Sequence, residues 1–148
     1  MRPQAAALLA ATLTFSLAAT AAGLNPCQLL TEADVKAAIP GEWKQDAQGA
    51  KDGICAYEAT GGKSLAIIAK QVSQGSAMVL GINMRAAGAK AKPAPGPGSG
   101  AFRVASRTNN AIQFGKGKYV ARLRANVAAT KDPAVLDRLA KAVYDRLP

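Results

Sequence analysis

The feature that most constrains the fold of this chain is a pair of cysteines, Cys27 and Cys55, the only two that it contains. They follow an N-terminal segment with the pattern of an export signal, and cysteines of exported proteins meet oxidising conditions. We therefore expect a disulfide that closes a loop of about 28 residues and stabilises the fold by about 3–4 kcal/mol. The alternatives are two free buried thiols or a redox-active pair, although redox-active cysteines are usually close in sequence, as in C-x-x-C.

Residues 1–22 have the three parts of a secretory signal peptide. A positively charged start precedes an apolar run over 5–17, and the small residues around Ala21 and Ala22 fit a signal-peptidase site. The run is shorter than the about 20 residues of a membrane-spanning helix, so an uncleaved anchor is the alternative. A lipoprotein is not expected, because no lipobox precedes the first cysteine. The sequence predicts a periplasmic or secreted protein with a single domain over 23–148.

The charge of the chain is basic and uneven. Lysine and arginine number 19 against 9 acidic residues, for a formal net charge of +10. No acidic residue lies between Glu58 and Asp132. The basic residues of that interval are Lys63, Lys70, Arg85, Lys90, Lys92, Arg103, Arg107, Lys116, Lys118, Arg122, Arg124 and Lys131. A field of one sign attracts nucleic acid, anionic lipid headgroups or acidic glycans. The alternative is that the positive balance only keeps an exported protein soluble.

The residue types present argue against most catalytic machinery. The chain has no histidine, which removes Ser-His and Cys-His nucleophile systems and the imidazole ligands of metal sites. We expect no cofactor, no metal site and no catalytic residues. Asp46, Asp52 and Glu58 are the carboxylates that a carboxylate-dependent enzyme would use. Nucleic-acid motifs are absent, and the glycine-rich segment 96–100 lacks the lysine and the helix of a phosphate-binding loop.

The first part of the chain predicts a helix followed by a loop. Thr31 is a good N-cap, Asp34 occupies the capping-box position, and Pro40 ends the helix. Residues 42–53 are polar and predict a loop. Trp43, the single tryptophan, is either a platform that stacks on a ligand or a cover for the edge of the core.

A hairpin and a second helix follow. Strands over 54–57 and 65–72 flank a Gly-Gly turn. The segment 73–88 predicts a helix with a buried stripe at helical spacing, formed by Ala77, Leu80, Met84 and Ala87. Residues 89–100 are rich in proline and glycine and predict an extended, mobile loop.

The last part predicts a three-stranded meander and a helix. Short alternating strands around Arg103 and Ile112 precede the clearest strand, 118–127, in which apolar and basic residues alternate. One face of the sheet is therefore expected to be apolar and the other basic. The basic face is expected to hold Lys118, Arg103, Arg122 and Arg124.

Asp132 and Pro133 are the expected N-cap and first residue of the last helix. Its expected buried stripe is Leu136, Leu139, Val143 and Leu147. Together these elements predict an α+β domain with an antiparallel five-stranded sheet, made of the hairpin and the meander, packed by three helices.

Several segments of this chain resemble the corresponding segments of a known group of proteins. They are Asn25-Pro26-Cys27-Gln28-Leu29-Leu30-Thr31, Asp34-Val35, Cys55-x-Tyr57, the terminal helix and, more weakly, Gly98-Ser99-Gly100-Ala101-Phe102. Many members have a glycine-aspartate-alanine sequence at the last of these segments. This chain has no aspartate there. On these residues the chain resembles a family of secreted bacterial envelope proteins and lipoproteins known only as a domain of unknown function. The resemblance implies export, an antiparallel α+β fold and a Cys27–Cys55 disulfide, and it implies no catalytic residues.

The sequence therefore predicts a non-catalytic exported envelope protein. We expect a binding module that holds an anionic ligand or surface on its basic face. A structural or assembly subunit that docks on an envelope protein is the alternative, and a carboxylate-dependent enzyme is the third hypothesis.

Overall fold

The computed structural model describes residues 23–47 and 53–148. Its strands form a single antiparallel sheet. Within these residues the sheet has seven strands in the order β1-β2-β3-β7-β6-β5-β4. The strands are β1 (Lys44–Asp46), β2 (Ile54–Ala59), β3 (Lys63–Gln71), β4 (Ala91–Pro93), β5 (Phe102–Ala105), β6 (Asn109–Lys116) and β7 (Tyr119–Asn126). The helices are α1 (Pro26–Leu29), α2 (Glu32–Ala38), α3 (Ser76–Ala87) and α4 (Pro133–Arg146), with a short 3-10 helix, η2 (Gly88–Lys90). The expected signal peptide, 1–22, lies outside the described residues.

The predicted five-stranded sheet with three helices is wrong. The described residues form seven strands and four helices, and the two additional strands, β1 and β4, are the two edges of the sheet. Both lie in segments that were expected to be loops, 42–53 and 89–100. Each has three residues and pairs on one side only, so it needs no alternation of apolar residues. Pro93 is tolerated in β4 because an edge strand has a side that makes no ladder hydrogen bonds.

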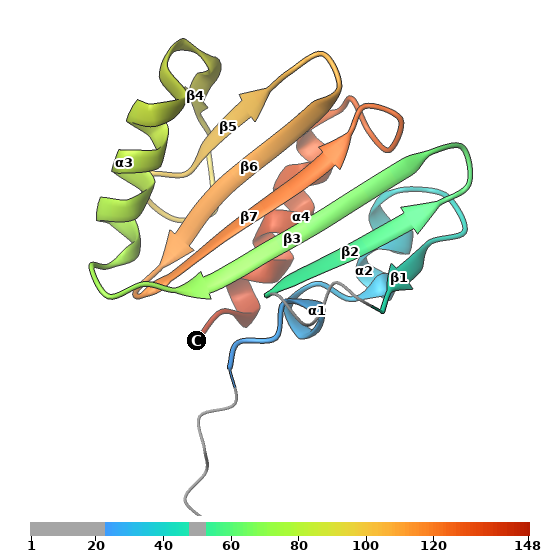
Figure 1. The fold of residues 1–148 in the computed structure, drawn as a ribbon, viewed down its shortest axis with the longest axis horizontal. Helices are drawn as coiled ribbons and strands as arrows, with labels where there is room; N and C mark the ends of the chain where they lie inside the picture. The colour runs from blue at the N-terminus through green and yellow to red at the C-terminus, as the bar shows by residue number, and fades with distance from the viewer. Residues whose placement is uncertain (1–22, 48–52) are drawn as a thin grey trace, which may run out of the picture.

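Helices cover the two faces of the sheet unequally. In Figure 1, α4 crosses behind the central strands, whereas α3 lies at the β4–β5 end. The larger core joins α1, α2 and α4 to the inner face of the sheet, where Tyr57, Ile67 and Leu123 are fully buried. A smaller core lies on the outer face under α3 and consists of Leu80, Phe102 and Val120. The rest of the outer face has no helix over it among the described elements.

Two helix starts are confirmed by their capping contacts. Thr31 Oγ1 accepts a hydrogen bond from Asp34 N at 3.3 Å, and the Asp34 carboxylate accepts one from Thr31 N at 2.8 Å, which completes a capping box. Asp132 caps α4 by accepting from Ala134 N at 2.9 Å. The predicted apolar stripe of α4 is also buried, so this helix packs on the sheet as its periodicity indicates.

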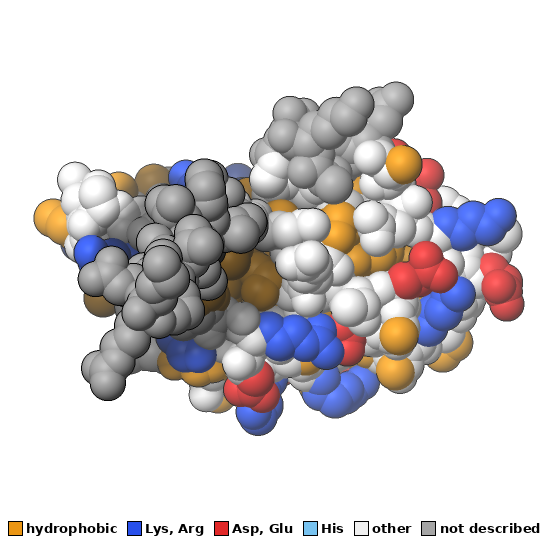
Figure 2. All heavy atoms as spheres, turned by 90° about the horizontal axis from the view of Figure 1, so that it is seen from below, with side chains coloured by type: hydrophobic (Ala, Val, Ile, Leu, Met, Phe, Trp, Pro, Cys, Tyr) orange, Lys and Arg blue, Asp and Glu red, His pale blue; other side chains and the backbone are white. Residues whose placement is uncertain are grey.

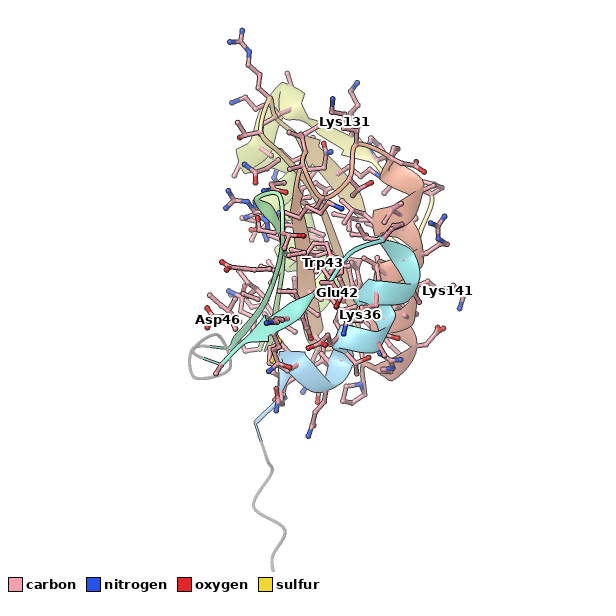
Figure 3. All side chains as sticks on the ribbon, turned by 90° about the vertical axis from the view of Figure 1, so that its right-hand side faces the viewer. Lys36, Glu42, Trp43, Asp46, Lys131 and Lys141 are labelled. Carbon is pink, nitrogen blue, oxygen red and sulfur yellow. A yellow bond between two sulfur atoms is a disulfide. The ribbon has the colours of Figure 1, made fainter. Side chains whose placement is uncertain are left out.

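The predicted disulfide is present between Cys27 in α1 and Cys55 in β2, with their Cα atoms 5.2 Å apart. It joins the first helix to the second strand, since β1 precedes β2. Trp43 is only 1% exposed and its Nε1 donates to Ile39 O at 2.9 Å. Figure 3 shows Trp43 between the sheet and the helices. Of the two roles considered for Trp43, the structure supports a place in the core.

The predicted second helix is confirmed as α3, but its buried stripe differs from the expected one. Leu80 and Ser76 are buried, whereas Ala77 and Met84 are exposed. The N-terminus of α3 lies close against β6, because Ser76 N donates to Gly117 O at 2.9 Å. A Cβ atom on Gly115 would lie 2.4 Å from Ser76 Cβ, so glycine at this position permits the close approach.

Candidate functional site

The part of the outer sheet face that α3 leaves uncovered is the candidate functional site. We call it the open face. Its outward-facing residues are Ala56, Glu58, Ser64, Ala66, Ile68, Lys70, Ala111, Gln113, Arg122 and Arg124. It spans β2, β3, β7 and β6, and it is the side of the sheet that faces away from α4.

Arg122 and Arg124 lie on the open face as the alternation of β7 predicts. Both are exposed, whereas the intervening Leu123 is fully buried in the inner core. Lys118 lies in the turn between β6 and β7 and is also exposed. Its carbonyl oxygen accepts a hydrogen bond from Val72 N at 2.7 Å, so it sits at the end of the sheet, beyond the open face.

Arg103 does not belong to this surface, and its expected place with Arg122 and Arg124 is corrected. It lies opposite Ile112 in the ladder of β5 and β6, and Ile112 is buried in the inner core. There the Arg103 guanidinium forms an ion pair with Asp137 of α4. The pattern was misleading because the neighbour Phe102 is buried on the outer face, under α3. A shift of one residue in a strand moves a side chain to the other face.

The pairing of β3 with β7 places Lys70 near Arg122 on the open face. Ile68 lies directly opposite Arg122, and Lys70 is two residues further along β3, the diagonal position at about 7–8 Å. Lys70 and Arg122 line one shallow depression of about 180 Å³. Asn83 of α3 and Gln113 line the same depression, and Asn83 Nδ2 donates to Gln113 Oε1 at 3.0 Å. The sequence could not assign Lys70 to the site, because β3 and β7 are far apart in the chain.

Two further depressions of about 200 Å³ each adjoin the arginines. Arg122 and Arg124 both line the first, which also contains Ser106 and Asn109. Arg124 also lines the second, together with Glu58. The three depressions therefore share their walls, and two guanidinium groups separate them along β7.

The small neighbours of Arg124 leave these depressions open. Its cross-strand partners are Ala66 on β3 and Ala111 on β6. A methyl group on each side reaches less far from the sheet than the guanidinium does, so a ligand can approach the guanidinium from either side.

The two arginines of the open face form no ion pair with a described carboxylate, although Glu58 lines one depression together with Arg124. The ion pairs among the described residues are Lys36–Glu32, Arg103–Asp137, Lys141–Asp145 and Arg146–Asp34. Arg124 Nε donates to Asn109 Oδ1 at 3.1 Å, which orients the side chain without removing its charge. Elsewhere the signs of charge are mixed, and Figure 2 shows acidic and basic side chains interspersed on the side seen from below.

Asp46 and Glu58, two of the carboxylates considered for catalysis, lie towards the β1 edge of the sheet, and Glu58 also belongs to the open face. Asp46 and Glu58 line an open depression of about 590 Å³ next to Lys44, at the β1 edge. Lys44 is directly opposite Glu58 in the ladder. Asp52 lies outside the described residues. The structure thus brings two of the three carboxylates to one depression.

The strongly shifted pKa values belong to a different part of the molecule, where α1, α2 and α4 meet. The Arg146 guanidinium binds Asp34 through both carboxylate oxygens, at 2.5 and 3.0 Å, and holds the pKa of Asp34 well below its usual range. Burial raises the pKa of Tyr57 to about 12, and its hydroxyl donates to Leu30 O. The ordinary explanation is structural, since these contacts tie the N-terminal helices to β2 and α4. Arg146 lies outside the apolar stripe of α4, yet its guanidinium binds Leu29 O and Asp34 and is not simply solvated.

The described residues contain neither a candidate metal cluster nor a candidate membrane-spanning helix. No group of three or more His, Cys, Asp or Glu side chains among them is placed to hold a metal ion. Within the same residues, no helix has the length and apolar character needed to cross a membrane.

Comparison with family models, with curated proteins and with solved structures finds no match for this chain.

Proposed function

We propose that this protein is an exported, non-catalytic binding module that holds an anionic ligand on its open face through Lys70, Arg122 and Arg124. The observation that carries the proposal is the pair of exposed guanidinium groups on β7, which line three adjoining depressions and form no ion pair with a described carboxylate. Arginine presents a planar fork of donors that matches carboxylate and phosphate groups.

Export to the periplasm or medium is part of this proposal. Its support is the signal-like composition of residues 1–22, the disulfide, and the resemblance of the segment around Cys27 to secreted envelope proteins. A disulfide is compatible with an oxidising compartment.

The exposure of the cations indicates a ligand with several negative groups. An ion pair at an exposed site contributes at most about 1 kcal/mol, which is far below the about 4 kcal/mol of a millimolar complex. A small ion with one charge would therefore bind poorly, whereas a polyanion can engage all three cations at once.

The test is salt-dependent retention of the mature, disulfide-bonded protein on immobilised heparin. The variant Arg122→Ala/Arg124→Ala removes two contacts, and the slope of log K against log salt should become shallower by about 1.5. The matched control is Arg138→Ala/Lys141→Ala, which removes the same charge from α4 on the other side of the sheet. Figure 3 shows Lys141 pointing away from the sheet.

Equal effects of the two double variants would refute the proposal, because retention would then follow net charge alone. Arg122→Lys/Arg124→Lys keeps the charge but removes the planar fork. We expect this variant to be retained less strongly than the wild type, since a single ammonium cannot reproduce bidentate contacts.

An assembly role on an envelope protein is the second candidate. Ile68 favours it, because this side chain is 40% exposed and lies directly opposite Arg122, and interfaces between proteins combine apolar side chains with arginine. Crosslinking followed by purification from native periplasm tests this role. Two results together would favour the assembly role over the first proposal. One specific protein should be recovered in a way that depends on Ile68, and heparin retention should be unchanged in Arg122→Ala/Arg124→Ala.

A further inference from the structure

The outward side of α3 is apolar although it faces solvent. Among the described residues, the exposed large apolar side chains are Ile68, Met78, Ile82 and Met84, and all but Ile68 belong to α3. A surface helix normally places charged or polar residues on the side opposite its core. The outward side of α3 is therefore a surface without a partner in the described structure.

The direction of each side chain follows from the contacts of α3 with the sheet. Ser76 and Leu80 are buried and Asn83 bonds to Gln113, so these positions face inward. At about 100° per residue, Met78 and Ile82 lie on the opposite side, where they are 57% and 45% exposed. We call these two side chains the α3 patch. Met84 lies about 120° around the helix from Met78 and is less exposed, at 37%.

Basic residues surround the α3 patch. Arg85 lies one turn beyond Ile82 on the same side of the helix. Lys118 lies at the N-terminal end of α3, since Gly117 O accepts from Ser76 N at 2.9 Å. Lys90 and Lys92 follow directly after the C-terminal end and are exposed. The chain contains no acidic residue between Glu58 and Asp132, and that interval includes α3, η2 and the strands from β3 to β7.

Apolar side chains with a basic rim match the chemistry of an anionic lipid surface. A helix lying in the plane of a bilayer inserts its apolar side to a depth of about 5–10 Å. Each lysine or arginine near an anionic surface strengthens binding by about fivefold. Lysine and arginine also keep their charged groups at the headgroups while their stems lie along apolar surface.

The size of the α3 patch also favours a bilayer over a protein partner. A stable interface between proteins buries about 800 Å² on each partner, which is far more than two side chains of one helix provide. A bilayer needs no complementary shape. We infer that α3 docks in the plane of an anionic bilayer surface, with Met78 and Ile82 inserted and the surrounding lysines and arginines at the headgroups. The bilayer would thus be a second anionic partner of the proposed anion-binding protein, bound through residues outside the open face.

The test is co-sedimentation of the mature, disulfide-bonded protein with vesicles of phosphatidylcholine alone and of phosphatidylcholine mixed with phosphatidylglycerol. We expect binding to the mixed vesicles only. Met78→Ser should weaken that binding by about fivefold or more, because it removes a side chain that enters the apolar layer. The matched control is Met84→Ser, which makes the same change on the same helix and should have much less effect. Circular dichroism of both variants shows whether they remain folded.

A second measurement separates insertion from simple attraction of charges. A variant with Ile82→Trp places an indole in the α3 patch, and its fluorescence should shift to the blue on the mixed vesicles, beyond the signal of the buried Trp43. Binding without this shift would overturn the inference, as would equal losses in Met78→Ser and Met84→Ser. Capture of a protein partner through Met78, with no binding to vesicles, would also overturn it.

The two proposals can fail separately. Retention on heparin that depends on Arg122 and Arg124, without binding to mixed vesicles, overturns docking through α3 and leaves the proposed function standing. Binding to mixed vesicles that depends on Met78, with heparin retention that does not depend on the two arginines, supports docking and refutes the function assigned to the open face.

Discussion

Reduction of the Cys27–Cys55 disulfide should lower the free energy of unfolding by about 3.6 kcal/mol. The two cysteines are 28 positions apart, and the chain-entropy relation for a loop of that length gives about 12 cal/mol/K, or about 3.6 kcal/mol at 25 °C. Reduction leaves both sulfur atoms in place, so the packing around fully buried Cys55 is nearly unchanged. The difference therefore measures the restraint on the unfolded chain.

The expected loss is large for a domain of this size. Small domains are stable by about 5–15 kcal/mol, so the reduced protein should keep between about a quarter and three quarters of its stability. With a urea dependence of about 2 kcal/mol per molar, the unfolding midpoint should fall by nearly 2 M. The slope should also rise, because the unfolded chain without the crosslink exposes more surface.

Trp43 supplies the assay, since it is the only tryptophan in the chain and is 1% exposed in the folded state. Urea titrations with and without reductant give the two midpoints from its fluorescence. The variant Cys27→Ala/Cys55→Ala is the control, and reductant should not change its midpoint. A difference below about 1 kcal/mol between oxidised and reduced wild type would refute the loop-closure reasoning.

Three further predictions concern the inner side of the molecule. Arg103→Leu should destabilise the protein by about 1–3 kcal/mol, because it leaves the Asp137 carboxylate unpaired. The same variant should lower heparin retention no more than Arg138→Ala does. Normal stability combined with weakened retention would contradict this prediction. The Arg146 guanidinium lowers the pKa of Asp34 below its usual 3.8, so the resulting stabilisation is present above that pH and lost as pH falls. Urea titrations of wild type and Asp34→Asn should therefore differ at neutral pH and converge in acid. Burial raises the pKa of Tyr57 from 10.0 to about 12, so its contribution to stability is complete below pH 10 and lost as pH rises towards about 12. An absorbance titration should lose its last tyrosine step in Tyr57→Phe, and a retained step would assign that pKa elsewhere.

The elements that the sequence predicts well are those specified by near neighbours in the chain. The capping box joins Thr31 to Asp34, and Asp132 caps its own helix. In β7 the alternation of buried and exposed residues follows the alternation of apolar and basic residues. Each of these signals depends on contacts within a few positions, so it can be recognised without knowing the tertiary structure.

The edge strands could not be predicted because their structure depends on a partner strand. All three residues of β1 are exposed, so the segment carries no apolar pattern. Its pairing with β2 supplies the hydrogen bonds that make it a strand. The backbone of Gln45 also donates to the Glu32 carboxylate of α2 at 3.3 Å, a contact between residues that are distant in sequence. In β4, Pro93 argued against a strand, and only its position at the edge permits it.

The candidate site was predictable for Arg122 and Arg124 but not for Arg103, because the sequence shows alternation without showing which face is which. A two-residue period shows that Arg103 and Phe102 face opposite ways, but it does not show which side faces the main core. The question is open in this protein because both faces of the sheet bury apolar side chains, one under α4 and the other under α3. Membership of the site is therefore decided by register, which places Arg103 opposite buried Ile112.

The distribution of the few acidic residues explains why some cations are free to bind a ligand and others are not. The chain has 9 carboxylates for 19 basic residues. Asp34 and Asp137 pair with Arg146 and Arg103, two arginines that connect α4 to other elements. In those places an unpaired charge would be partly buried and costly. Arg122 and Arg124 have no described carboxylate partner, and an exposed arginine remains hydrated without one. Two of the nine acids therefore compensate arginines that connect elements inside the structure, whereas Arg122 and Arg124 keep their positive charge on the open face.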